Sequence, residues 1–201
     1  EGARIRAGKP YLDRQPQIWS NSRLVSKACL EITNARYAML HQAICAGSFD
    51  PPTDGHINIV SRGLKMFDKV IVAVAMNTSK DTLFTVHERV EMLREIFADY
   101  QNVEIDAFEG LLVEYAKKRG VHTILRGLRT IGDYDYESQM ALANKTLDPD
   151  IEFLYMMTEG KYAHISSSVI KEVIRFGGSG CGMIHPLVAR RLKEKLLRKG
   201  S

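Results

Sequence analysis

The feature that most constrains the fold is a regular alternation of short apolar stretches with longer amphipathic ones, which begins at Leu40. Five apolar stretches have the length and composition of buried parallel strands, near residues 41–46, 69–76, 103–108, 122–126 and 151–157. Apolar residues recur at helical spacing near residues 55–67, 85–99, 111–119, 133–146, 166–176 and 186–199. This order favours a single α/β domain, Rossmann-like and doubly wound, with a five-stranded parallel sheet and two C-terminal helices. Ligands bind such sheets at the carboxyl ends of the strands.

Residues 1–38 lack this pattern and hold the charge imbalance of the chain. They carry seven basic and three acidic residues, which accounts for the whole net charge of +4, so residues 39–201 are balanced. We interpret the segment as a leader or an added extension: an expression remnant, a start assigned upstream of Met39, or a targeting peptide, the last disfavoured by its acidic residues. The balanced domain over 39–201 argues against a general nucleic-acid surface, which needs uncompensated Lys and Arg.

Cysteine, histidine and hydropathy patterns exclude several further classes. No apolar run approaches the roughly 18 residues that a membrane span needs, so no membrane association is expected. Cys29, Cys45 and Cys181 are odd in number and far apart, so neither a disulfide framework nor a zinc site is indicated, and a cytoplasmic location is expected. The histidines show no metal-ligand spacing, so no metal held by the protein is expected.

The segment from Gly47 to His56 follows the first predicted strand and leads into a helix. Gly47 lets a ligand approach the backbone, and His56 lies at the helix N-terminus, where free N–H groups and the helix dipole favour an anion. The imidazole can then donate a hydrogen bond to a phosphate oxygen. The alternative is a polar turn in which His56 only caps the helix, and spacing alone does not separate the two. No P-loop motif occurs anywhere in the chain.

Basic side chains follow two further predicted strands. Lys80 comes after the second, where its ammonium group can serve as a point charge for a phosphate, although a lone lysine is more often solvated surface. Arg126 and Arg129 come at the end of the fourth, and they form a fork for a polyphosphate if the turn is helical. The alternative pairs both arginines in structural ion pairs with the acidic residues that follow, Asp133, Asp135 or Glu137.

A fourth cluster, His164-Ile-Ser-Ser-Ser168, opens a predicted helix. One serine suffices to cap a helix, so three successive hydroxyls indicate additional donors to an anion. The four clusters supply cations and hydrogen-bond donors, and the chain has neither a G-x-S-x-G elbow nor an identifiable partner for a thiol. Phosphate binding without a nucleophile from the protein is therefore the predicted chemistry.

The combination of G-S-F-D-P-P-T-D-G-H, N-x-S-K, R-G-L-R and I-S-S-S-x-x-K-E closely resembles bacterial phosphopantetheine adenylyltransferases, from Met39 to about Lys199. The T-x-G-H element alone is shared by the wider nucleotidyltransferase superfamily, and the last two motifs narrow the resemblance. The chain departs from the family's pattern twice: Ser48 stands where threonine is usual, and Cys45-Ala46 where tyrosine-proline is common. Ser48 keeps the hydroxyl, so activity is expected to persist.

The resemblance implies transfer of AMP from ATP to 4′-phosphopantetheine, with Mg²⁺ carried mainly by the ATP phosphates. It implies catalytic roles for Ser48, His56, Lys80 and Arg129, and acceptor binding by Ser48, Lys80, Leu112 and Arg126. The implied ATP contacts are Ser48, Phe49, His56, Gly127, Leu128, Arg129, Glu137, Tyr162, Ala163, His164, Ile165, Ser166, Ser167 and Ser168. It also implies a homohexamer and coenzyme A as a feedback ligand.

Two other functions stay open at this point. A related adenylyltransferase that acts on nicotinate mononucleotide would share the T-x-G-H element. A catalytically silent nucleotide-binding module would share the fold and bind ATP without releasing pyrophosphate. Pyrophosphate release with phosphopantetheine alone, with nicotinate mononucleotide alone, or with neither acceptor distinguishes the three functions.

Overall fold

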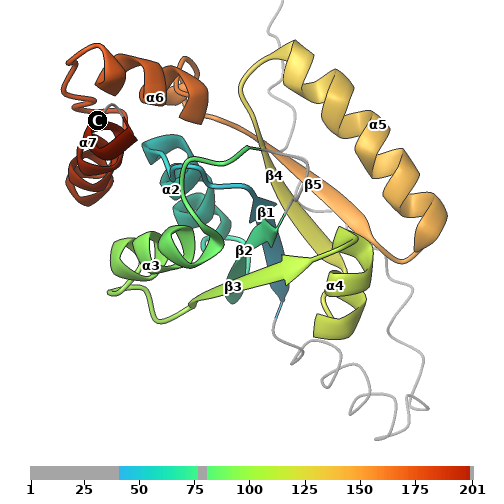
Figure 1. Cartoon of the computed structure of the whole chain (residues 1–201). Coiled ribbons are helices and arrows are strands. Elements are labelled where there is room, and N and C mark those ends of the chain that lie inside the picture. The colour runs from blue at the N-terminus through green and yellow to red at the C-terminus, as the bar shows by residue number, and fades with distance from the viewer. Residues whose placement is uncertain (1–40, 77–80, 200–201) are drawn as a thin grey trace, which may run out of the picture. The chain divides into compact units, whose positions relative to one another are not determined.

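The computed structural model describes residues 41–76 and 81–199, and every structural statement below concerns these residues (Figure 1). Strands alternate with helices in the predicted order. The strands are β1 (Gln42–Gly47), β2 (Lys69–Met76), β3 (Val103–Glu109), β4 (Thr123–Leu128) and β5 (Glu152–Met157). The helices are α2 (Asp54–Gly63), α3 (Val86–Ile96), α4 (Leu112–Arg119), α5 (Ile131–Leu147), α6 (Ser167–Arg175) and α7 (Pro186–Lys199), with a 3₁₀ turn at Gly160–Tyr162. The predicted leader, 1–38, lies outside the described residues.

The five strands form one parallel sheet in the order β3-β2-β1-β4-β5. The chain builds outward from β1 to β3, then returns to place β4 on the other side of β1. The strand order therefore reverses between β1 and β4, which are paired at Ile44 and Ile124. At such a point the loops after the two strands leave toward opposite faces, and a ligand crevice opens outside their carboxyl ends. The predicted fold class is confirmed.

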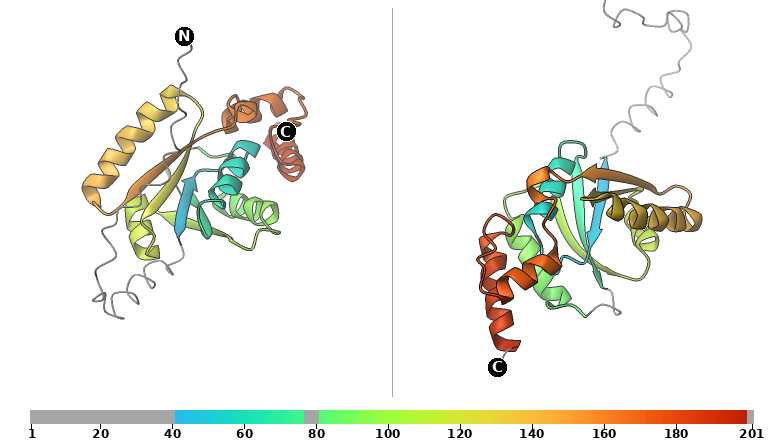
Figure 2. Two further views of the ribbon diagram at one scale, coloured as in Figure 1. Left: turned by 180° about the vertical axis from the view of Figure 1, so that it is seen from behind. Right: turned by 90° about the horizontal axis from the view of Figure 1, so that it is seen from above.

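Both faces of the sheet are covered at its centre, and for this reason β1 and β2 read as nearly continuous apolar runs, whereas the edge strand β3 carries Glu104 and Asp106. In β2, Val70, Val72 and Val74 face the core under α2 and α3, whereas Ile71 and Ala73 face the core under α4. All five side chains are fully buried, and each valine or isoleucine contributes about 1.5–3 kcal/mol by leaving water. Figure 2 shows α5 on the α4 side of the sheet.

The two C-terminal helices extend the domain beyond the sheet. They pack on α3 through a separate buried cluster that contains Phe84, Met92, Ile165, Ile170, Ile174, Ile184, Val188 and Leu192. Ion pairs of Lys195 with Glu88 and of Arg191 with Glu95 also join α7 to α3. This packing brings the start of α6 to the loop after β1.

Side-chain hydroxyls start four of the helices. Thr53, Thr85, Thr130 and Ser166 each accept a backbone N–H three residues ahead, which satisfies a donor that has no partner within the helix. At the other end of α4, Gly120 closes the helix in the left-handed conformation, with φ 63°. None of the described helices combines the length and apolar character needed to cross a membrane.

The fourth strand is longer than predicted. We expected it to end near residue 126, but its parallel pairing with β5 continues to Leu128, opposite Met157. Hydrogen bonding to this edge strand keeps the backbone extended, so the first three residues of R-G-L-R lie within β4. The helical turn that our arginine-fork hypothesis required is therefore not formed.

Candidate active site

The loop after β1 is held tightly at the point where the strand order reverses. Phe49 adopts a left-handed backbone conformation, with φ 48°, and its ring is buried in the core. Gly47 lies against that ring, since a Cβ at this position would lie 3.2 Å from it. Ser48, between the two, is half-buried. The loop therefore presents Ser48 and its own backbone from a fixed position.

His56 takes part in the cap of α2 through one ring nitrogen. Its Nδ1 accepts the backbone N–H of Thr53 at 3.0 Å, while the Thr53 hydroxyl accepts the backbone N–H of His56. Because Nδ1 is an acceptor in this capping box, the proton of the neutral ring lies on Nε2. The Phe49 ring meets the imidazole edge-on, with centroids 5.0 Å apart, and fixes its plane. The two interpretations of His56, as a helix cap and as a phosphate donor, are therefore compatible: Nδ1 takes part in the cap and Nε2–H is available to donate.

The electrostatic surroundings keep this imidazole neutral. Burial, together with the positive charges of Arg129 and Arg126, lowers the pKa of His56 to about 4. At neutral pH the side chain therefore presents an uncharged Nε2–H donor beside two guanidinium groups. Such a group can stabilise charge that grows on a phosphate oxygen.

Arg126 is held by a carboxylate from α5. Its Nε donates to Glu137 Oε2 at 2.8 Å, its Nη2 donates to Glu137 Oε1, and its Nη1 donates to the carbonyl of Ala46 at the end of β1. The predicted ion pairing of the arginine is thus confirmed for Arg126. Glu137, which we expected to contact ATP, points at this guanidinium.

Arg129 joins the end of β4 to the segment before α6. Its Nε and Nη2 each donate to the Asp133 carboxylate at 3.0 Å, and its Nη1 donates to the carbonyl of Ile165 at 3.2 Å. Its side chain is 37% exposed, compared with 25% for Arg126, so Arg129 is the more accessible of the two to a ligand. Both arginines form ion pairs, and the positive charges of both still lower the pKa of His56.

The three predicted serines have different surroundings. Ser166 caps α6 by accepting the N–H of Val169 at 3.1 Å, and Ser167 donates to the carbonyl of Pro51 at 2.8 Å. Ser168 is exposed and lines a cavity between α6 and the connection after β2. The cap that the sequence indicated is present, and one hydroxyl ties α6 to the β1–α2 loop.

The other predicted ATP contacts differ in how far their side chains are exposed to solvent. Ile165 and Leu128 have buried side chains, so only their backbone atoms are available to a ligand. Tyr162 packs partly into the core of the C-terminal helices. Gly127 and His164 are exposed, and Ala163 is half-buried.

The predicted acceptor site is described in part. Leu112 is half-buried at the first position of α4, packed against the core on that face of the sheet. Lys80 lies outside the described residues, so its predicted role stays a prediction.

Sequence reasoning missed Arg89, a buried cation on α3 beside the β1–α2 loop. It is 2% exposed, and its Nη1 donates to the carbonyl of Ser48 at 2.6 Å and, more weakly, to that of Ala75 at 3.4 Å. The guanidinium therefore links the carboxyl ends of β1 and β2. The signal was present: Arg89 stands in the apolar stripe formed with Val90 and Leu93, where a charge needs a buried partner.

The donor set of this site suits anions better than a metal held by the protein. Among residues 41–76 and 81–199, no three His, Cys, Asp or Glu side chains are grouped as metal ligands. The two carboxylates nearest the arginines, Asp133 and Glu137, are already bound to them.

Comparison with solved structures agrees with the fold. A candidate nicotinate-nucleotide adenylyltransferase from Vibrio parahaemolyticus superposes with a TM-score of 0.54 at 16% identity, over 77% of this chain and 99% of that one. At this identity the similarity concerns the fold alone.

Sequence comparison identifies the family. Residues 44–173 match the cytidylyltransferase-like family. The phosphopantetheine adenylyltransferase of Caldanaerobacter subterraneus subsp. tengcongensis is 52% identical over 153 residues, 76% of this chain and 96% of the relative. That of Desulfatibacillum aliphaticivorans is 48% identical over 162 residues, 81% of this chain and 93% of the relative. The chain therefore belongs to the phosphopantetheine adenylyltransferases, within the cytidylyltransferase-like nucleotidyltransferases.

Proposed function

We propose that the chain transfers AMP from ATP to 4′-phosphopantetheine and so makes dephospho-coenzyme A and pyrophosphate. The names of its relatives support this reaction. The observation that carries the mechanism is the neutral Nε2–H donor of His56, placed beside Arg126 and Arg129 where the strand order reverses.

The chemistry of the substrates matches a site that lacks a nucleophile. An oxygen of the acceptor phosphate attacks the α-phosphorus of ATP, the bond from that phosphorus to the β-phosphate oxygen breaks, and pyrophosphate leaves. The second pKa of a phosphate monoester lies near ~6, so the attacking oxygen is already ionised at neutral pH. The protein then needs to align two anions and offset their charge.

Each described site residue has a place in this mechanism. The Ser48 hydroxyl orients the attacking phosphate, and the neutral His56 donates to the oxygen on which charge grows. Arg126 faces the acceptor phosphate, while Arg129 and the serines of α6 bind the nucleotide. The ion pairs with Glu137 and Asp133 keep both guanidinium groups oriented before substrate arrives. Lys80 adds a further cation for the acceptor phosphate.

Mg²⁺ enters this proposal as part of the Mg·ATP substrate. The phosphate oxygens supply the hard ligands that the ion prefers, and its charge offsets that of the leaving pyrophosphate. The protein residues act on the remaining anionic oxygens by donating hydrogen bonds and by holding the two substrates in line.

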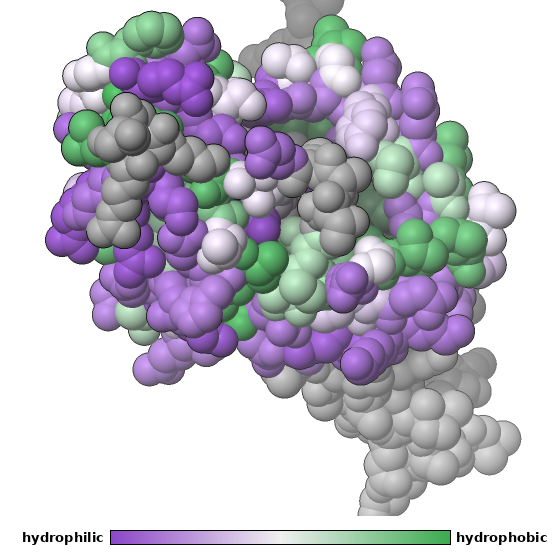
Figure 3. All heavy atoms as spheres, viewed as in Figure 1, coloured by the Kyte–Doolittle hydropathy of each residue, from purple (hydrophilic) through white to green (hydrophobic). Residues whose placement is uncertain are grey.

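The assembly state and location are further parts of the proposal. We infer a homohexamer in the cytoplasm, with coenzyme A as a competing ligand. Exposed apolar side chains on α5 support an oligomer, among them Ile131 at 84% and Leu142 at 72% exposure. Figure 3 shows hydrophobic residues gathered over the C-terminal part of this helix. Sedimentation velocity on the full chain tests the assembly, since a monomer or dimer would contradict it.

A pyrophosphate-release assay tests the proposed function directly. The full chain is incubated with ATP and Mg²⁺, and with either 4′-phosphopantetheine or nicotinate mononucleotide. Release with phosphopantetheine alone is the expected result. Release with nicotinate mononucleotide alone would assign the other transferase activity, and tight ATP binding without release on either acceptor would indicate a silent module.

A further inference from the structure

Asp50 is a buried carboxylate that the mechanism above does not use. It is 5% exposed and lies two residues after Ser48 in the β1–α2 loop. Its Oδ1 accepts the backbone N–H of Phe84, and its Oδ2 accepts that of Leu83, both at 2.9 Å. Oδ2 also accepts from Lys171 Nζ at 3.0 Å. One carboxylate therefore joins the β1–α2 loop, the connection between β2 and α3, and α6.

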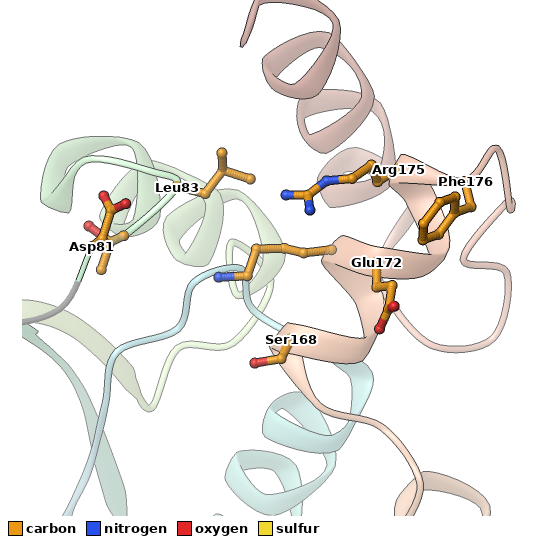
Figure 4. Close-up of a pocket in the computed structure, with 8 residues that line it drawn as sticks. Asp81, Leu83, Ser168, Glu172, Arg175 and Phe176 are labelled. Carbon is orange, nitrogen blue, oxygen red and sulfur yellow. The ribbon is translucent and has the colours of Figure 1, made fainter. Parts of the chain in front are cut away.

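Two of these segments form opposite walls of a cavity of about 380 Å³. Figure 4 shows Arg175 pointing from α6 toward Leu83 on the other wall. Leu83 and Lys171 line the cavity and both donate to Asp50. The bonds of this one side chain therefore join the two walls, in addition to the buried apolar cluster that contains Phe84, Ile170 and Ile174.

The charges of the cavity do not make it a separate anion site. Lys171, Glu172 and Arg175 line it from α6 and Asp81 lines it from the other wall, so two basic and two acidic residues balance. Asp50 differs from these groups because it is buried and forms an ion pair with Lys171. Each oxygen of this carboxylate has a donor with good geometry, which is the condition for a buried charge to be tolerated.

We propose that Asp50 is a positioning residue for the transfer reaction. It holds α6 and the β2–α3 connection against the loop that presents Ser48. Ser168 lies three residues before Lys171 on α6, so a shift of Lys171 moves that hydroxyl as well. The transfer reaction meant here is the one given as the proposed function, and the inference rests on that proposal.

Only a carboxylate fits this position. Asparagine has the same shape but one acceptor oxygen, and its amide nitrogen would face donors. The change Asp50→Asn therefore leaves at least one of three donors without a partner and loosens the contact between the walls. Displacements of about 1 Å at a phosphate-transfer site cost about 10²-fold in rate.

The experiment compares four purified full-length variants with the wild type: Asp50→Asn, Lys171→Met, the double variant, and Glu104→Gln as control. Glu104 lies near the start of β3, away from the carboxyl ends of the strands. Its carboxylate forms ion pairs with Lys69 and Arg119. Pyrophosphate release gives kcat and the KM for ATP, calorimetry gives ATP affinity, and thermal unfolding gives stability.

We expect Asp50→Asn to lower kcat at saturating ATP by about 10²-fold, with a folded protein at the assay temperature. Lys171→Met should lower it less, since it keeps both backbone bonds to Asp50. The double variant should be no worse than Asp50→Asn, because both changes act through one contact. Glu104→Gln should lose stability without losing rate.

Wild-type kcat and ATP affinity in Asp50→Asn would overturn the inference, as would losses in the two single variants that simply add. If Asp50→Asn does not fold, wild-type kcat and ATP affinity in Lys171→Met would overturn it equally well. A wild-type protein that releases no pyrophosphate would instead refute the proposed function. The ATP affinity of the variants, measured by calorimetry, would still test the role of Asp50.

Discussion

The two nitrogens of His56 predict two separable effects of substitution. Replacing His56 with alanine removes the acceptor that caps α2 and the Nε2–H donor together. The Thr53 hydroxyl still caps the helix, and loss of the hydrogen bond from the Thr53 N–H to Nδ1 costs about 1 kcal/mol of folding stability. Loss of a donor aimed at developing charge costs about 2.7–4 kcal/mol of transition-state stabilisation, or about 10²–10³ in kcat. The affinity for ATP should change little, because the donor acts mainly in the transition state.

Glutamine at the same position separates these effects. In a capping box the residue three positions after threonine is commonly Glu or Gln, so His56→Gln can still accept the Thr53 N–H. We expect His56→Gln to be more stable than His56→Ala by about 1 kcal/mol. Its amide oxygen is then engaged in the cap and its amide nitrogen lies elsewhere than Nε2. Its kcat should therefore be as low as that of His56→Ala.

Urea unfolding and pyrophosphate release on the three proteins measure stability and rate independently. Wild-type kcat in His56→Ala would refute the assigned role of the Nε2–H. Recovery of kcat together with stability in His56→Gln would also refute it. The rate loss in alanine would then come from a loosened start of α2.

Three further predictions follow from the described contacts. Burial and two arginines hold the pKa of His56 near 4, below its ordinary 6.5, so the unfolded chain takes up this proton first. Stability should be complete above about pH 6.5 and fall toward pH 4, and urea titrations should show a shallower fall in His56→Gln. Arg129→Ala, which removes the Asp133 ion pair and the bond to Ile165, should raise the KM for ATP more than that for phosphopantetheine; steady-state kinetics giving the reverse order would exchange the roles of the two arginines. Burial raises the pKa of the Cys45 thiol to about 11, whereas Cys181 is exposed, so mass spectrometry after brief maleimide labelling at pH 8 should find adduct on Cys181 and none on Cys45.

Periodicity predicted the fold because the strands are buried on both faces. The central strands β1 and β2 are short and mostly apolar, and the helices between strands have one apolar face, so the two patterns differ clearly in the sequence. The predicted end of β4 was wrong because it depends on pairing with another strand. Its extension to Leu128 depends on hydrogen bonds to β5, and pairing between segments distant in sequence leaves no trace in a local pattern.

The position of the candidate site was predictable from the motifs that follow the predicted strands. Motif spacing placed Ser48, His56 and the arginines at one edge of the sheet, and the structure brings them together. It did not show that Glu137 and Asp133 hold the arginines, because both alternatives use the same residues. Arg89 and Asp50 went unassigned because their partners are largely backbone groups, which every residue carries and no motif records.

The bond between Thr53 and Nδ1 of His56 has a consequence for engineering this protein. A library selected for heat resistance will accept residues at position 56 that start the helix well, and glutamine or glutamate will survive alongside histidine. A library selected for turnover will reject them. Thermostable variants chosen without an activity screen are therefore expected to accumulate inactive sequences at this one position.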